Sequence, residues 1–491
     1  MEFIRGENRE QALLLPDCVE DYVEENNAVR VIDAYINSLD LAELGFAKAE
    51  PNDTGRPMYN PHDLLKLYVY GYMNRIRSSR RLETESKRNL EVLWLLGRLS
   101  PDHKTIANFR RDNAGALKNV FHHFVRLCAQ MGLYGKELIA IDGSKFKAVN
   151  SRKRNYTEKQ IQDKIAGITG KIDEYMKELD RNDAAEDAAG REKSKEEMAR
   201  IISSLRGHKR RYEGYAAELG QTGEAQKSLT DAESRLMPAN GKMDVCYNVQ
   251  TAVDAKNKLI ADFEVSNQGN DKNFITPMAV GVQEVLGTET IAAVADGGYE
   301  SIQDIISARC YGVEAHIAGT DFDICVPAED GGREEISTHH NGRCVYIGGR
   351  NIALCPMGKV LYPVSFKKSK GLGVFRNSEA CQGCACKCTK DVTGRFKHQV
   401  PMAQEKFSKE YNDEGLAIKQ IRIKPDKTLI AQRKCIVEHP FGTVKRAMDA
   451  GYCLTKGLRK VGGEFSLTFL AYNLKRVINI LGCGKLIASM A

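Results

Sequence analysis

The sequence lacks long apolar runs, and none of its apolar stretches approaches the roughly 18 residues that cross a bilayer. The longest stretches, at residues 138–141 and 290–295, have the length of buried strands. The first residues, MEFIRGENRE, contain no apolar segment of the kind that directs secretion. We therefore expect a protein that stays in the cytoplasm and has no membrane partner.

A phosphate-binding loop of the GxxxxGK[ST] type is also missing, so ATP use is not indicated. The sequence also lacks a strong excess of one charge, because it contains 72 Lys and Arg residues and 65 Asp and Glu residues. The net charge of +7 permits nucleic-acid binding but does not demand it. Most of the 14 cysteines stand singly, which is typical of reduced thiols, but one cluster lies between residues 355 and 388.

The chain has 491 residues, of which 42% are hydrophobic, so about three domains with sizeable cores are expected. Residues 1–130 are predicted to form a helical N-terminal domain. Pro61 suits a first helical turn, and Ser100 is a candidate cap for a helix at residues 103–113. That helix carries Arg110 and Arg111. A series of short basic helices indicates a helix-turn-helix-like DNA-binding unit. A helical bundle with a solvated basic face explains the same pattern.

Beyond residue 136 the pattern changes to strands that alternate with helices. Strands are predicted at residues 138–143, 243–255, 258–265, 290–295 and 312–317, and helices at residues 273–286 and 301–310. Three strands, a helix, a strand and then further helices is the order of a ribonuclease H-like α/β core.

Two inserts interrupt this core. Within the first, residues 157–236, apolar residues recur every three or four positions along two segments, which predicts an antiparallel helical hairpin with arms of about 35 Å. Its mixed charges favour a packing or spacer element. The second insert, residues 321–423, holds the cysteine cluster. The core itself is assigned to residues 136–156, 237–320 and 424–485.

Two predicted strands end in an acid followed by glycine, at Asp142-Gly143 and Asp296-Gly297. Carboxylates at the carboxyl ends of strands in an open α/β sheet face a crevice. Phosphodiester chemistry uses such carboxylates to hold two divalent ions, and hard oxygen ligands suit Mg²⁺ or Mn²⁺. Asp-Gly is also a common turn, so these two pairs alone leave both interpretations open.

A third acid stands in the segment RKCIVEHPFGTVKR at residues 433–446. Glu438 and Lys445 are seven residues apart, so on a helix they share a face. Pro440 places Glu438 near the start of a helix or at a kink in one. Such an acid can bind metal while the lysine contacts a DNA phosphate. An ordinary pair of surface charges, too distant to form a salt bridge, is the alternative.

These segments together resemble the DDE transposases of bacterial insertion sequences. The resemblance covers nearly the whole chain in order, and it is carried by the N-terminal NPHDLLKLYVYGYMNRIRSSRRLE, by AIDGSKFKAVNSRKRNYT at 140–157, YNVQTAVD at 247–254, AVADGGYES at 293–301, IVEHPFGTVKR at 436–446 and LTFLAYNLKRVINIL at 467–481. The family implies a DNA transposase with a catalytic triad on a ribonuclease H-like fold.

Carried over by position, the resemblance makes Asp142, Asp296 and Glu438 the catalytic acids and the ligands of two Mg²⁺ or Mn²⁺ ions. It implies cleavage of double-stranded DNA at the terminal inverted repeats and strand transfer into target DNA. A homodimer in the DNA complex and association with the nucleoid follow as expectations. The residues expected to contact DNA are Lys445, Arg433, Lys145, Arg110 and Arg111.

Two positions depart from the related tyrosine-arginine-glutamate-lysine motif. Lys434 and Ala431 stand where that motif has its arginine and tyrosine, and Arg433 is the nearest arginine. The phosphate contact is therefore assigned to Arg433 or to Lys434. Gly298 also stands where relatives more usually carry a lysine after the second acid. Neither departure removes a metal ligand.

The cysteine cluster suggests a structural zinc site formed by Cys355, Cys381, Cys384 and Cys388, with Cys386 spare or substituting. A set of reduced thiols explains the same residues. For the whole chain, the alternatives to a transposase are a plain metal-dependent nuclease and a transposase-derived DNA-binding regulator. Loss of a triad acid would favour the regulator, and all three acids are present.

Overall fold

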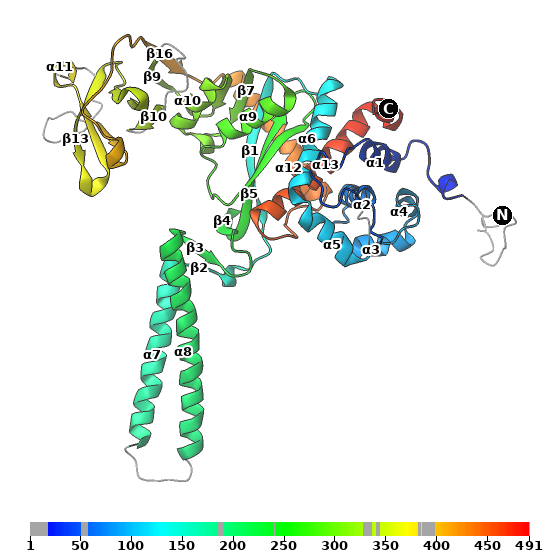
Figure 1. The fold of residues 1–491 in the computed structure, drawn as a ribbon, viewed down its shortest axis with the longest axis horizontal. Helices are drawn as coiled ribbons and strands as arrows, with labels where there is room; N and C mark the ends of the chain where they lie inside the picture. The colour runs from blue at the N-terminus through cyan, green and yellow to red at the C-terminus, as the bar shows by residue number, and fades with distance from the viewer. Residues whose placement is uncertain are drawn as a thin grey trace.

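The computed structural model describes residues 18–50, 57–183, 191–239, 241–327, 336–339, 344–381, 384 and 398–490. A mixed sheet lies at the centre, with helices from both ends of the chain on one side and a second, smaller sheet on the other (Figure 1). A long helical hairpin projects away from both. Within the described ranges, no helix is long and apolar enough to cross a membrane.

The N-terminal region is helical, as predicted. It contains the 3-10 helix η1 (Val19–Tyr22), α1 (Ala28–Asn37), α2 (Pro61–Met73), α3 (Ser79–Arg88), α4 (Leu90–Leu95), α5 (His103–Asp112) and α6 (Ala114–Gln130). Pro61 occupies the first turn of α2, as expected. The cap of α5 is Asp102, whose side chain accepts from two backbone N–H groups. Ser100 was the wrong candidate cap because it lies two residues further out.

The C-terminal helix α13 (Leu458–Leu481) packs against α6, α2 and α5, and the short α14 (Cys483–Ala488) follows it. Gly463 allows the approach to α6, since a Cβ there would lie 2.8 Å from Cα of Ala114. Next to Gly463, Glu464 accepts from Arg77, which also donates to the backbone oxygens of Asp449 and Tyr452. The two ends of the chain therefore form one packed helical layer beside the sheet.

The central sheet has the order β4-β5-β1-β7-β8, with β6 pairing with β5. Its strands are β1 (Leu138–Lys147), β4 (Arg235–Ala239), β5 (Lys242–Asp254), β6 (Ile260–Ser266), β7 (Ile291–Ala295) and β8 (Val313–Ile317). β1 is antiparallel to β5 and parallel to β7. Helix α9 (Ile275–Leu286) packs on β5, β6 and β7, α10 (Ile302–Cys310) on β8, and α12 (Lys427–Gly442) on β1 and β7. The predicted strands and helices of this region are present, but β1 continues four residues past its predicted end and β4 was not predicted.

The first insert is the predicted antiparallel hairpin of α7 (Glu158–Asp183) and α8 (Arg191–Thr222). With 26 and 32 residues, the arms extend about 39 and 48 Å at 1.5 Å per residue, longer than expected. Apolar side chains buried along the hairpin include Ile161, Ile172, Met198, Ile202 and Leu219. Its base is a two-stranded ribbon of β2 (Asn155–Thr157) and β3 (Gln226–Ser228), preceded by the 3-10 helix η2 (Arg152–Arg154).

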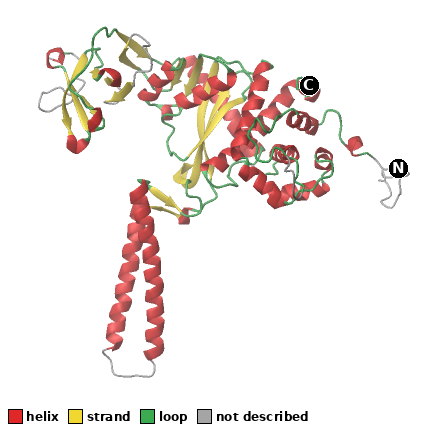
Figure 2. Cartoon of the chain, in the orientation of Figure 1, coloured by secondary structure: helices red, strands yellow, loops and turns green. Residues whose placement is uncertain are grey.

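The second insert is built mainly from strands (Figure 2). A ribbon of β9 (Phe322–Pro327) and β16 (Ile418–Ile423) leads the chain in and out. Beyond it lies a sheet in the order β10-β11-β12-β13-β14-β15. These strands are β10 (Ile336–His339), β11 (Cys344–Ile347), β12 (Ile352–Leu354), β13 (Val360–Lys367), β14 (Leu372–Arg376) and β15 (His398–Pro401), with the short helix α11 (Ser378–Cys381) after β14.

Candidate functional site

Asp142 lies within β1 and not at its end as predicted, because β1 continues to Lys147. The antiparallel partner β5 pairs with β1 as far as Lys147, whereas the parallel partner β7 pairs only up to Ala140. Asp142 therefore stands just past the last residue of β1 that pairs with β7. The pKa of Asp142 is raised to about 6, chiefly by burial; Arg433 counteracts this rise, and the nearby carboxylates of Asp296 and Asp271 contribute to it.

Asp296 follows the last residue of β7, as predicted, and caps the 3-10 helix η3 (Gly297–Tyr299). Its Oδ1 accepts a 2.8 Å hydrogen bond from the backbone N–H of Gly298. Ala140 pairs with Val294, so Asp142 and Asp296 each lie two residues beyond the same step of the parallel ladder. Strand register thus brings together two acids that are separated by more than 150 residues.

Arg433 joins the two acids. Its Nη1 lies 3.6 Å from Oδ1 of Asp142 and 3.9 Å from Oδ2 of Asp296. The guanidinium comes from α12, which packs against β1 and β7. A cation held between two carboxylates shows that this position favours positive charge.

Glu438 also lies on α12, but its side chain is exposed. Within the described part of the chain, no ion pair or hydrogen bond joins it to Asp142 or Asp296. Five residues separate Glu438 from Arg433, a turn of about 140° on a helix with 3.6 residues per turn, so the two side chains lie on different faces. The predicted place near a helix start is wrong, because α12 begins at Lys427 and Glu438 stands near its end. Pro440, which the alternative prediction associated with a kink, lies inside the helix.

The expected shared face of Glu438 and Lys445 is not formed by a regular helix. Lys445 lies in η7 (Thr443–Ala447), a π-helical turn that follows α12. Its Nζ donates to Oγ of Ser144 at 2.5 Å and to the backbone oxygen of Lys145 at 3.1 Å. Burial lowers the pKa of Lys445. This lysine therefore packs onto β1, on the segment that follows Asp142.

A third carboxylate near the acid pair was missed by sequence reasoning. Asp271, in the loop between β6 and α9, pairs with Nζ of Lys145 at 2.9 Å. It also accepts from the side-chain amides of Asn248 and Gln250 on β5, each at 2.7 Å. A polar loop offers no periodic signal, and Asp271 lies between the predicted strand at 258–265 and the predicted helix at 273–286.

The remaining basic residues predicted to contact DNA have different surroundings. Arg110 is buried, donates to the hydroxyl of Tyr72 at 2.9 Å and lies over the ring of Tyr68. The structure thus contradicts its assignment as an exposed DNA contact, because α5 turns this residue toward the aromatic core. Arg111, the next residue, is exposed and pairs with Asp112.

The cysteine prediction is covered only in part, because Cys386 and Cys388 lie outside the described residues. Cys355 begins a tight turn in which its sulfur accepts from the N–H of Lys359 at 3.3 Å. Cys381 packs against the small core that contains Cys355, and the charges of Cys355 and Cys384 raise the pKa of Cys381 beyond the effect of burial. These three thiols lie near one another.

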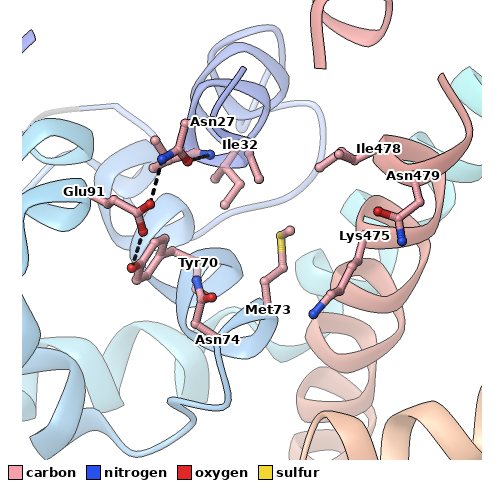
Figure 3. Close-up of a pocket in the computed structure, with 11 residues that line it drawn as sticks. Asn27, Ile32, Tyr70, Met73, Asn74, Glu91, Lys475, Ile478 and Asn479 are labelled. Atoms are coloured by element: carbon pink, nitrogen blue, oxygen red, sulfur yellow. Dashed lines mark hydrogen bonds between the residues drawn. The ribbon is translucent and has the colours of Figure 1, made fainter. Parts of the chain in front are cut away.

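A small cavity lies elsewhere in the helical layer, between α1, α2 and α13 (Figure 3). It has a volume of about 200 Å³. On one side, the carboxylate of Glu91 accepts from Asn27 at 2.7 Å and from Tyr70 at 2.6 Å. None of the predicted acids lines the cavity, so it is separate from the acid pair.

The acid pair fits hard divalent cations by the chemistry of its donors. Carboxylate oxygens of Asp142 and Asp296, with a third carboxylate nearby, are ligands that Mg²⁺ and Mn²⁺ accept. The position of Gly298 also fits such a site, because carboxylate oxygens of two acids lie close to it. A Cβ built there would lie 2.9 Å from Oδ1 of Asp296 and 3.9 Å from Oδ2 of Asp271. As the described side chains stand, no three Cys, His, Asp or Glu residues surround a common ion position.

Comparison with known protein families gives two matches. Residues 17–112 match a family described as a transposase domain, and residues 354–478 match one described as a transposase DDE domain. The second match contains Arg433, Glu438 and Lys445, whereas Asp142 and Asp296 precede it. No curated protein and no solved structure matches the chain.

Proposed function

The chain is a DDE transposase, an enzyme of a family that cuts DNA with divalent metal ions, and from this premise we propose that Asp142, Asp296 and Glu438 are its catalytic acids. The observation that carries this proposal is the strand register that sets Asp142 beside Asp296 with one guanidinium between them. Glu438 is included because it is the acid of α12, the helix that packs across both strands.

We propose that the central sheet with α9, α10 and α12 is a ribonuclease H-like core. Its segments are residues 136–156, 237–320 and 424–485, and residues 1–130 form a helical DNA-binding domain. The remaining two parts of the proposed domain organisation are the hairpin insert, residues 157–236, and the cysteine-rich insert, residues 321–423. The sheet order, with one antiparallel partner and one parallel partner beside β1, supports this assignment.

The proposed reaction is hydrolysis of the phosphodiester at each element end, followed by attack of the freed 3′-hydroxyl on target DNA. Two Mg²⁺ or Mn²⁺ ions, when bound, neutralise phosphate charge and activate the attacking oxygen. Asp142 and Asp296 hold this site from adjacent strands. Arg433, once the acids are neutralised, is free to pair with a DNA phosphate. Lys445 positions the strand segment after Asp142 through Ser144 and also supplies positive charge.

Double-stranded DNA, as terminal inverted repeats and as target, is the proposed substrate. We propose a homodimer in the DNA complex, because two ends must be brought together before they are joined to one target. Exposed Arg111 is retained as a DNA contact, and buried Arg110 is not. Lys145 is retained only as a residue that neutralises charge near the acids, since it already pairs with Asp271.

Cleavage of DNA that carries the two element ends, in the presence of Mg²⁺ or Mn²⁺, tests the function. We expect wild-type protein to cut these ends and to join pre-cut ends to a target, which separates a transposase from a plain nuclease. Glu438→Gln should lower both rates by at least about 100-fold, the cost of losing one charge-stabilising group. Glu284→Gln, which changes an exposed glutamate on α9, is the matched control. Wild-type cleavage by Glu438→Gln would remove this residue from the triad.

We also propose a structural zinc site around Cys355, Cys381 and Cys384, with Cys325 of β9 as an additional candidate ligand. The sulfur of Cys325 lies 3.3 Å from the position of a Cβ at Gly358, in the turn that Cys355 begins, and it donates to the backbone oxygen of Pro356 at 3.4 Å. Thiolates are the ligands of closed, structural zinc sites. Cys325 precedes the cluster by 30 residues, so spacing alone did not indicate it.

Purified protein should therefore contain about one zinc ion per chain, measured by elemental analysis. Cys325→Ser should lose most of this zinc, whereas Cys435→Ser, which changes an exposed cysteine on α12, should retain it. Zinc-free wild-type protein would refute the site. Full zinc content in Cys325→Ser would exclude Cys325 and leave the fourth ligand to Cys388.

A further inference from the structure

Asp271 lies near both glycines that follow the acid pair, Gly143 within β1 and Gly298 in η3. A Cβ at Gly143, which follows Asp142, would overlap the amide of Gln250 and lie 2.6 Å from Oδ1 of Asp271. A Cβ at Gly298, two residues after Asp296, would lie 3.9 Å from Oδ2 of Asp271. The two glycines therefore leave room for a carboxylate that approaches from the loop before α9.

One oxygen of Asp271 is held firmly by the protein. Oδ1 accepts from Lys145 at 2.9 Å and from the amides of Asn248 and Gln250 at 2.7 Å each. Both amides belong to fully buried residues of β5, where a polar group costs free energy unless it is hydrogen-bonded. Gln250 also accepts from the hydroxyl of buried Tyr299. This network fixes the orientation of the carboxylate.

The other oxygen faces the acid pair. Among the described residues, no hydrogen bond reaches Oδ2 of Asp271. A Cβ built at Gly298 would lie 3.9 Å from Oδ2 of Asp271 and 2.9 Å from Oδ1 of Asp296. The two carboxylate oxygens therefore lie around the same small region next to Gly298. Asp271 is also close enough to raise the pKa of Asp142. Carboxylates that share a site repel one another unless a cation lies between them.

Building on the proposed function, we propose that Asp271 is a fourth acid of the divalent-ion site, with Oδ1 fixed by β5 and Lys145 and with Oδ2 directed to the ion held by Asp296. The amides of Asn248 and Gln250 are then positioning residues, because they act through Asp271, whereas Lys145 balances the charge of its carboxylate. This assignment explains why two buried amides of a central strand converge on one loop residue. It also explains why the residue after Asp142 is glycine, since any side chain there would displace Asp271.

The test is a titration of the DNA-free, full-length chain with Mn²⁺. Binding is measured as the decrease in the electron paramagnetic resonance signal of free Mn²⁺. Asp271→Asn keeps the shape of the side chain but removes its charge. We expect it to weaken Mn²⁺ binding by roughly 10- to 100-fold, the range seen when supporting groups of metal sites are removed. The matched control is Asp244→Asn. Asp244 on β5 also pairs with a lysine of β1, because its Oδ2 lies 3.8 Å from Nζ of Lys147.

Lys145→Ala distinguishes two roles for Asp271: an acid that faces the ion, or an acid that serves only to hold Lys145. If Asp271 faces the ion, loss of Lys145 leaves Mn²⁺ affinity unchanged or higher, because the carboxylate keeps its charge. If Asp271 serves only to hold Lys145, Asp271→Asn and Lys145→Ala have the same effect on Mn²⁺ binding, and the inference is overturned.

Two further variants distinguish this inference from the proposed function. Asp142→Asn and Asp296→Asn should each weaken Mn²⁺ binding. If they do and Asp271→Asn binds like wild type, only the inference fails. If Mn²⁺ binding is unaffected by all three changes, the acid pair is not the ion site and the proposed function fails with it. Equal melting temperatures for Asp271→Asn and Asp244→Asn show that the comparison is made on folded proteins.

Discussion

Asp142→Asn and Asp296→Asn are expected to abolish DNA cleavage and strand transfer, each with a loss of at least about 100-fold. Removal of a single group that stabilises transition-state charge already costs this much. Each substitution also removes one of the two carboxylates that Arg433 pairs with, so its charge then neutralises the remaining acid alone. The rates are measured with element-end DNA and Mg²⁺, separately for cleavage and for joining of pre-cut ends.

The substitutions are nearly isosteric, so DNA binding should remain close to wild type and can be measured by gel shift. Asp244→Asn serves as the control here as well, because it changes an aspartate of the same sheet that has its own lysine partner. A variant at position 142 or 296 that cuts at the wild-type rate would show that the strand register does not mark the catalytic centre.

Glu464→Ala should have the largest effect on stability. Glu464 is 1% exposed on α13 and accepts from Arg77, from the N–H groups of Leu454 and Thr455 and from the Thr455 hydroxyl. Arg77 is also buried, so truncation of Glu464 leaves an unpaired buried charge. Such a change costs about 3–5 kcal/mol in the free energy of unfolding.

The measurement is urea unfolding followed by the fluorescence of Trp94, the single tryptophan of the chain. Trp94 lies in α4, within the helical layer that Arg77 ties to α13. Glu264→Ala is the control, because Glu264 is exposed and pairs with Lys118 at 3.2 Å; its effect should stay below about 1 kcal/mol. Equal destabilisation by the two changes would mean that the Arg77–Glu464 pair does not hold the ends of the chain together.

Both aspartates follow short apolar segments with the length of buried strands, and the resemblance to DDE transposases is what singled them out as a pair of acids. The sequence also predicted the order of strands and helices around them. The end of β1 was misplaced because the antiparallel partner β5, whose pairing depends on distant residues, carries the strand past Asp142. Asp271 could not be found in this way, since it lies in a polar loop and gains its surroundings only when β5 is folded beside it.

Side-chain direction was the other limit of sequence reasoning. Arg110 and Arg111 are adjacent basic residues on one helix, yet one points into an aromatic core and the other into solvent. Glu438 and Lys445 have the spacing of two helical turns, but a proline and a π-helical turn intervene. Periodicity assumes a regular helix, so it fails where the helix is irregular or where packing selects an unexpected face.

The hairpin insert leaves and re-enters the body at neighbouring points, because Asn155 pairs with Ser228 in its basal ribbon. Hydrogen bonds from Asn150 and Asn155 to the Ser228 hydroxyl fix this junction. Whole helical turns can therefore be gained or lost in both arms together without altering the spacing of the sheet. Seven residues added to each arm would extend the hairpin by about 10 Å, so the reach of this projection is set separately from the geometry of the central sheet.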